Sequence, residues 1–96
     1  MEPKEKMAIN VMEKKHVLRL IVFVKEHPGC SKSDAINSLK GSDRTKFLRI
    51  DELIEYGFFF EDDAPRRSNT KKLYLTPKGQ ELALLIEKIF GLFPTA

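Results

Sequence analysis

Basic side chains form two groups in the second half of the chain, and both groups are of the kind that binds anions. The first lies in segment 42–57 and the second between positions 64 and 72, where no acidic residue occurs. A guanidinium donates two parallel hydrogen bonds to a phosphate or a base edge, and an ammonium neutralises a phosphate as a point charge. The residues are Arg44, Lys46, Arg49, Arg66, Arg67, Lys71 and Lys72. This pattern favours a partner that carries phosphate groups.

Length and composition predict a single soluble domain. The chain has 96 residues, of which 42% are hydrophobic and 32% charged, enough for one core under a charged surface. The net charge is only +3, so nucleic-acid binding is permitted but not required. The positions of the charges therefore matter more than their sum.

Catalytic and metal-binding patterns are missing from the sequence. There is no Ser-His-Asp arrangement, no phosphate-cradling glycine loop and no metal-ligand spacing, and His16 and His27 do not form a ligand set with the single Cys30. We expect no enzymatic activity, no metal and no cofactor. Cys30 is expected to be a small core residue, although a redox-sensing thiol before a helix is the alternative.

The sequence also predicts a cytoplasmic protein with no membrane span. The apolar run 17–24 is far shorter than the ~20 residues that a membrane-spanning helix needs. The charged N-terminus lacks the layout of a signal peptide.

The first half of the chain predicts two helices after a frayed N-terminus. Residues 1–8 are expected to be flexible, and a single domain is expected over 9–96. Apolar residues at helical spacing predict a first helix over 9–27, which Pro28-Gly29 ends. Ser31, with Asp34 three residues later, is a capping-box pattern that begins a second helix, expected to stop at Lys40-Gly41.

The second half predicts a third helix, two strands and a last helix. The third helix covers 42–56, opened by Ser42 and closed by Gly57. Only two residues then separate it from the second helix, so the two must cross steeply. Strands are expected at 58–60 and 73–75 around a long loop, and Thr76-Pro77 begins a helix that extends to about residue 93.

The third helix is expected to bury one face and expose the other. At 100° per residue, one face holds Phe47, Ile50, Leu53 and Ile54, and the opposite face holds Thr45, Leu48, Arg49, Glu52 and Tyr56, with Arg44 at its edge. The outward face would carry any binding function of this helix.

Three motifs, in order, resemble those of a known family. Pro28-Gly29-Cys30-Ser31 is similar to the start of the second helix in winged-helix regulators. The segment 50–57 resembles their I-x-x-L-x-x-x-G ending of the recognition helix, and 73–79 resembles their Y-x-L-T-x-K-G exit from the wing. The resemblance covers residues 14 to 90 and points to MarR-like and PadR-like transcriptional regulators and small archaeal winged-helix proteins.

The resemblance implies an α+β, mostly α, winged helix-turn-helix: a three-helix core, a two-stranded wing and a C-terminal helix. It implies a sequence-specific regulator of transcription with double-stranded DNA as partner. The recognition helix, 42–56, would enter the major groove, and the wing, 61–72, would contact the phosphate backbone or the minor groove. The expected DNA-binding residues are Lys32, Arg44, Thr45, Lys46, Arg49, Arg66, Arg67, Lys71 and Lys72.

The last helix, about 77–93, has more apolar residues than so small a domain can cover. We therefore expect a homodimer through this helix, joined by the N-terminal part of the first helix. The expected interface residues are Leu82, Leu85, Ile86, Ile89, Phe90 and Phe93. The alternative is that this stripe folds back on its own domain.

Two other functions fit the same fold. The nearly balanced charge and the acids around the third helix, Asp43, Asp51, Glu52 and Glu55, fit a winged-helix module that binds protein in a larger assembly. A sequence-tolerant chromatin protein would bind through backbone contacts alone. A continuous positive stripe from the third helix to the wing would favour DNA, and a broken stripe would favour the protein-binding module. The sequence identifies no operator and no effector ligand.

Overall fold

The first expected helix is two helices. The computed structural model describes residues 1–62 and 71–95, and it begins with α1 (Pro3–Glu13) and α2 (Val17–Glu26). The prediction of one helix over 9–27 was wrong because His16 has a left-handed backbone, with φ of 75°, which ends the helical path. Residues 3–8, expected to be frayed, belong to α1.

The next two helices form the helix-turn-helix. α3 (Lys32–Asn37) begins with the predicted capping box: the Ser31 hydroxyl accepts from the Asp34 amide, and the Asp34 carboxylate accepts from the Ser31 amide. α4 (Asp43–Glu55) follows after the connection 38–42, longer than the two residues expected because α3 is shorter. Gly57, with φ of 84°, ends α4 in the left-handed conformation that glycine adopts without strain.

A small antiparallel sheet closes one side of the helices. β2 (Phe59–Asp62) pairs with β3 (Lys72–Leu75), as predicted, with Phe59 opposite Leu75. A third strand, β1 (Cys30–Ser31), pairs with the other edge of β3, which gives the order β1-β3-β2. Two residues carry too little periodicity to be recognised as a strand, so only the two-stranded wing was predicted.

The last helix, α5 (Pro77–Phe90), begins where the sequence placed it. Thr76 accepts a hydrogen bond from the Gly79 amide at 3.0 Å and donates one to the Gly57 carbonyl at 2.5 Å. One threonine thus caps α5 and ties its first turn to the end of α4.

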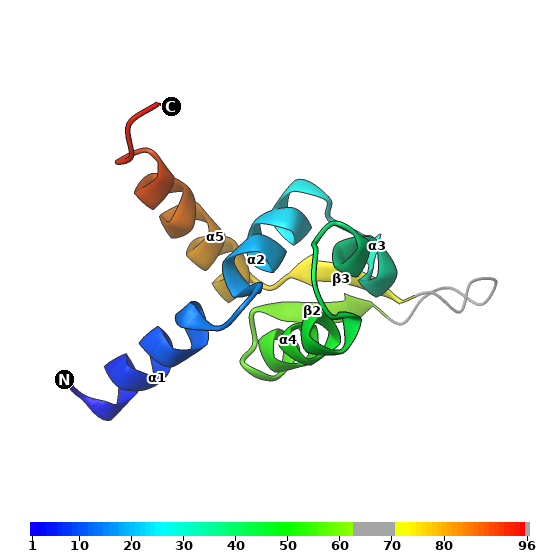
Figure 1. Cartoon of the computed structure of the whole chain (residues 1–96), viewed down its shortest axis with the longest axis horizontal. Helices are drawn as coiled ribbons and strands as arrows, with labels where there is room; N and C mark the ends of the chain where they lie inside the picture. The colour runs from blue at the N-terminus through cyan, green and yellow to red at the C-terminus, as the bar shows by residue number, and fades with distance from the viewer. Residues whose placement is uncertain (63–70, 96) are drawn as a thin grey trace.

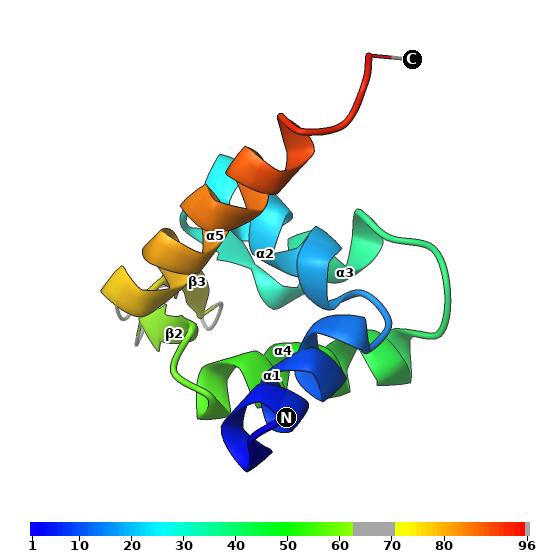
Figure 2. The ribbon, with the colours of Figure 1, turned by 90° about the vertical axis from the view of Figure 1, so that its left-hand side faces the viewer.

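Apolar residues from every strand and from all five helices form one core. Its fully buried side chains include Leu20 and Ile21 of α2, Ile50 and Leu53 of α4, and Phe59 of β2. Helices α1 and α5 extend away from the body on the same side, and each ends near a chain terminus (Figures 1 and 2). The two helices therefore leave apolar side chains outside the core.

Gly79 provides a test of how tightly the first turn of α5 packs against Phe58, the residue before β2. A Cβ added at Gly79 would collide with the Phe58 carbonyl oxygen, which belongs to backbone that cannot move away cheaply. Gly79→Ala should therefore lower the free energy of unfolding by about 1–3 kcal/mol, measured by urea denaturation. Gly91→Ala is the control, because a Cβ there meets only ordinary contacts. Equal stabilities for the two variants would contradict this account of the packing.

Candidate nucleic-acid interface

The solvent-exposed face of α4 differs in part from the predicted one. Lys46, Ile50 and Leu53 face the core, whereas Phe47 is 42% exposed, so the inward placement of Phe47 was wrong. The exposed face carries Arg44, Leu48, Asp51 and Glu55. Phe47 was placed in the core only because its side chain is apolar. In the structure Lys46, its neighbour in sequence, is buried instead.

Lys46 is buried inside the helix-turn-helix, with 2% of its surface exposed. Its ammonium donates hydrogen bonds to the Ile36 carbonyl at 3.0 Å and the Leu39 carbonyl at 2.8 Å, and lies 3.2 Å from Asp43. These carbonyls belong to the last part of α3 and its connection. Lys46 was predicted to contact DNA, and its burial contradicts that prediction, because every one of these contacts would have to break.

Arg49 lies on the side of α4 that faces α1. Its guanidinium donates to Glu52, which also accepts a hydrogen bond from Lys14 at 2.6 Å. The Lys14 hydrogen bond and the Arg49 charge hold the pKa of Glu52 below its usual range, against the effect of burial. Arg49 Nε is buried with no hydrogen-bond partner among the described residues. The arginine therefore lies beside the exposed face, not on it as predicted.

Lys32 has two carboxylate partners. Its ammonium lies 3.1 Å from Asp51 of α4 and 3.3 Å from Glu61 of β2. Burial disfavours its charge, but the two carboxylates outweigh burial and raise the pKa of Lys32. These two ion pairs join the start of α3 to α4 and to the sheet. They also compensate the positive charge of Lys32, which was predicted to contact a DNA phosphate. Thr45 is half-buried on α4.

The basic residues of the predicted wing are only partly described. Lys71 and Lys72 are exposed, and Lys72 pairs in the sheet opposite Asp62. Arg66 and Arg67 lie outside the described residues. Of the acids before this segment, Glu61 turns to Lys32, whereas Asp62 is exposed.

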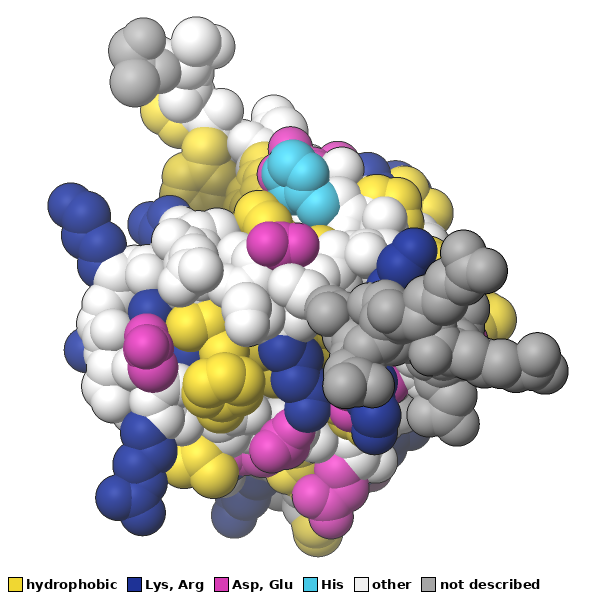
Figure 3. Space-filling model, turned by 90° about the vertical axis from the view of Figure 1, so that its right-hand side faces the viewer, with side chains coloured by type: hydrophobic (Ala, Val, Ile, Leu, Met, Phe, Trp, Pro, Cys, Tyr) yellow, Lys and Arg dark blue, Asp and Glu magenta, His cyan; other side chains and the backbone are white. Residues whose placement is uncertain are grey.

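Charges of both signs share the face that carries α3, α4 and the strand ends. Basic, acidic and apolar side chains alternate there without a continuous positive stripe among the described residues (Figure 3). Unpaired cations occur at its margins. Arg44 makes no ion pair with a described carboxylate, in contrast to Lys32, Lys46 and Arg49.

The outer face of α5 is apolar and largely uncovered. Exposed fractions are 50% for Leu85, 49% for Ile89, 51% for Phe90 and 69% for Phe93. Leu82 is half-buried, and Ile86 is only 2% exposed because it packs in its own core, so the prediction of Ile86 as an interface residue was wrong.

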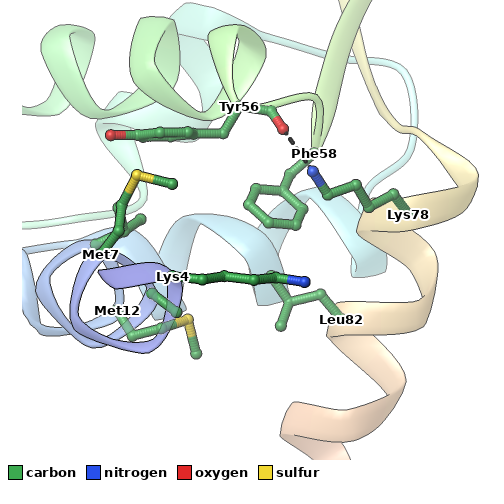
Figure 4. Close-up of a pocket in the computed structure, with 9 residues that line it drawn as sticks. Lys4, Met7, Met12, Tyr56, Phe58, Lys78 and Leu82 are labelled. Carbon is green, nitrogen blue, oxygen red and sulfur yellow. Dashed lines mark hydrogen bonds between the residues drawn. The ribbon is translucent and has the colours of Figure 1, made fainter. Parts of the chain in front are cut away.

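A groove of about 430 Å³ separates α1 from α5 (Figure 4). Lys78 crosses one end, where its ammonium donates to the Tyr56 carbonyl at 2.9 Å and lies 4.6 Å from the Phe58 ring centroid. Lys4 lies along the other wall. Apolar side chains line the rest: Met7, Val11, Met12, Tyr56, Phe58 and Leu82. The groove is continuous with the apolar side of α1.

The remaining candidate groups do not assemble into a reactive site. Cys30 is buried, as expected, and burial raises the pKa of its thiol, which is unfavourable for a redox sensor. His27 is exposed and packs against the Phe23 ring. Within 1–62 and 71–95, no cluster of His, Cys, Asp and Glu could hold a metal ion. No helix in those ranges has the length and apolarity of a membrane span.

Known structures share this fold. No protein-family model matches the sequence, and comparison with curated proteins finds no significant match. Several solved structures do match. Among them are the transcriptional regulator SlyA (23% identity, 81% of this chain, TM-score 0.73), a possible HxlR family transcriptional factor from Thermoplasma volcanium (22%, 96%, 0.71), and the transcriptional repressor CouR bound to a 23-mer DNA duplex (17%, 88%, 0.74).

At these identities the likeness establishes the fold, and the predicted winged helix-turn-helix is confirmed. The chain spans 55% of the SlyA chain and 59% of the CouR chain, less than two thirds of each, but 85% of the Thermoplasma volcanium protein.

The buried ammonium of Lys46 provides a test of the helix-turn-helix. Lys46→Met should lower the free energy of unfolding by about 1–3 kcal/mol, because it removes the ammonium donor of the Leu39 carbonyl and one of the two donors of the Ile36 carbonyl. Lys40→Met, on the exposed connection, should change stability by less than about 0.5 kcal/mol. Urea denaturation of both variants measures the difference. A Lys46→Met protein as stable as the wild type would show that the ammonium is not needed there.

Proposed function

We propose that this protein is a DNA-binding regulator of transcription that acts as a homodimer. The observation that carries the proposal is an exposed α4, at the front of a winged-helix fold, next to strand ends that carry Lys71 and Lys72. A helix of this size fits the major groove of double-stranded DNA. The match to regulators, one of them bound to a duplex, supports the same function.

Arg44 is the residue proposed to read bases. It lies in the first turn of α4, is exposed, and has no described carboxylate partner to compete for its guanidinium. A guanidinium at this position can donate two hydrogen bonds to the O6 and N7 atoms of guanine. Thr45 and Leu48 would contribute phosphate or thymine-methyl contacts. Arg49 could contact DNA only after its hydrogen bond to Glu52 breaks.

The wing is proposed to supply phosphate contacts. The sequence has four positive charges within seven positions here: Arg66, Arg67, Lys71 and Lys72. Neutralising phosphates with such charges releases bound counterions, which makes affinity dependent on salt. Lys32 would contribute less, because Asp51 and Glu61 already compensate its charge.

The homodimer is proposed to form through α5. Four apolar side chains each expose 49% or more of their surface and together form an apolar patch: Leu85, Ile89, Phe90 and Phe93. An exposed apolar patch of this kind is typical of an interface. The adjoining groove beside α1 extends that patch. A second copy of the chain would cover both and present two α4 helices to half-sites ~34 Å apart.

A protein-binding module is the second candidate, and one observation favours it. The exposed side of α4 carries the acids Asp51 and Glu55, and carboxylates repel phosphates. Phe47 and Leu48, 42% and 50% exposed, would suit a protein partner.

The two candidates differ in their binding to random duplex DNA. The DNA-binding proposal expects micromolar dissociation constants in ~50 mM salt and at least tenfold weaker binding in ~200 mM, measured by fluorescence anisotropy. Lys71→Gln with Lys72→Gln should make the salt slope shallower by about 1.8, since each phosphate contact contributes about 0.9. Absence of binding at the lower salt would reject the regulator and leave the protein-binding module.

The dimer is tested by a charge in the middle of the α5 patch. Ile89→Asp should yield a monomer in sedimentation equilibrium, because a carboxylate buried in an apolar interface loses its hydration. Gln80→Asp places the same charge on an exposed position of α5 away from the patch and should leave the dimer intact. A wild-type monomer at all concentrations, or a dimeric Ile89→Asp protein, would contradict this interface.

A further inference from the structure

A second basic surface lies beside the start of α4, apart from the wing. It surrounds a hollow of about 440 Å³ between the first turn of α2 and the connection 38–42. The hollow is lined by His16, Arg19, Ser38, Leu39 and Lys40, so its lining contains two full positive charges and no carboxylate. This set of lining residues is called the α2 basic hollow below.

The cations of the α2 basic hollow are free to bind an anion. Arg19 and Lys40 are exposed and form no ion pair with a carboxylate of the described residues. Most described cations near the helix-turn-helix instead have acidic partners. Two acids belong to adjoining segments: Glu13 lines a neighbouring hollow with Lys15 and Arg19, and Asp43 lies against Lys46.

His16 reports the positive potential at this place. Partial burial and the positive charges of Lys15, Lys46, Arg49 and Arg19 lower the pKa of its imidazole. The ring also packs on the connection, because a Cβ added to Gly41 would lie 3.3 Å from His16 Nε2. The His16 ring therefore lies between the start of α2 and the connection, which are the two walls of the hollow.

The hollow and the wing lie at different ends of α4. The start of α2 lies near the N-terminal end of α4, whereas β2 and β3 lie toward its C-terminal end (Figures 1 and 2). A duplex that receives α4 in its major groove has one phosphate backbone on each side of the groove. The described strands β2 and β3 lie toward one end of α4 only, and Lys71 and Lys72 belong to that end (Figures 1 and 2).

We infer that the α2 basic hollow binds a phosphate of the DNA backbone, through Arg19 and Lys40, on the flank of α4 opposite the wing. This inference rests on the proposed function. With a cation contact at both flanks, the helix is fixed in the groove at two points. The contact would offset the repulsion between DNA phosphates and the carboxylates of Asp51 and Glu55 on the exposed face. A phosphate contact does not distinguish one base sequence from another.

The test compares three double variants by anisotropy with random duplex DNA over ~50 to ~200 mM salt. Arg19→Gln with Lys40→Gln should bind roughly tenfold more weakly at the lower salt, with a slope shallower by about 1.8. Arg19→Lys with Lys40→Arg keeps both charges and should keep the slope. Lys6→Gln with Lys88→Gln removes two exposed cations elsewhere and should leave the slope unchanged. Circular dichroism and sedimentation check that all variants fold and assemble alike.

The outcomes separate this inference from the proposed function. Wild-type protein that binds no DNA overturns both. Wild-type binding combined with an unchanged slope in Arg19→Gln/Lys40→Gln overturns the inference alone. Inorganic phosphate, added at constant ionic strength, is the probe for a free anion. One further result is a melting temperature that phosphate raises in the wild type but not in Arg19→Gln/Lys40→Gln, while the salt dependence of DNA binding is the same in both. That result would assign the hollow to a small anion and overturn the DNA contact.

Discussion

The geometry of the helix-turn-helix depends on one buried ammonium. Lys46 reaches from α4 to the Leu39 carbonyl and to the Ile36 carbonyl, which also accepts from the Leu39 amide, and so adds donors where a six-residue helix ends. A buried charge is costly unless it is hydrogen-bonded and paired, and here Asp43 and the two carbonyls provide both. Since α4 must cross α3 at a defined angle for its outer face to meet a groove, this contact ties stability to the proposed function.

Neutralisation shapes the rest of the surface. Acids of α4 and β2 hold Lys14, Lys32 and Arg49, which therefore offer little charge to a ligand. Lys14 and Lys32 also fix separate elements to one another, whereas Arg49 pairs within α4. Cations that pair with no carboxylate in 1–62 and 71–95 lie at the margins of α4: Arg44 at its start, Arg19 and Lys40 beside it, and Lys71 and Lys72 at the strand end. A helix whose own exposed face is partly acidic can still lie in a groove when cations hold the backbones on both sides.

The two helices outside the compact body follow a different constraint. Thr76 and Gly79 fix the first turn of α5 against the end of α4, and beyond Ile86 the core no longer covers the helix. Helix α1 diverges from the body because His16 breaks the path between it and α2. Between them they leave an apolar groove and an apolar helix face, a combination that a second chain would bury more fully than this domain can.

Local patterns in the sequence determined most of the fold. The capping box at Ser31, the glycine after α4, the paired strands and the Thr76-Pro77 start of α5 depend on neighbouring residues, and each was predicted. Tertiary structure alone decided three things: the left-handed break at His16, the short β1 strand, and which side chains of α4 face inward. Phe47 and Arg49 were placed on the wrong faces, and Lys46 was assigned a phosphate contact, because helical periodicity fixes only angles around an axis. What lies at each angle, whether carbonyls, a carboxylate or water, depends on segments distant in sequence.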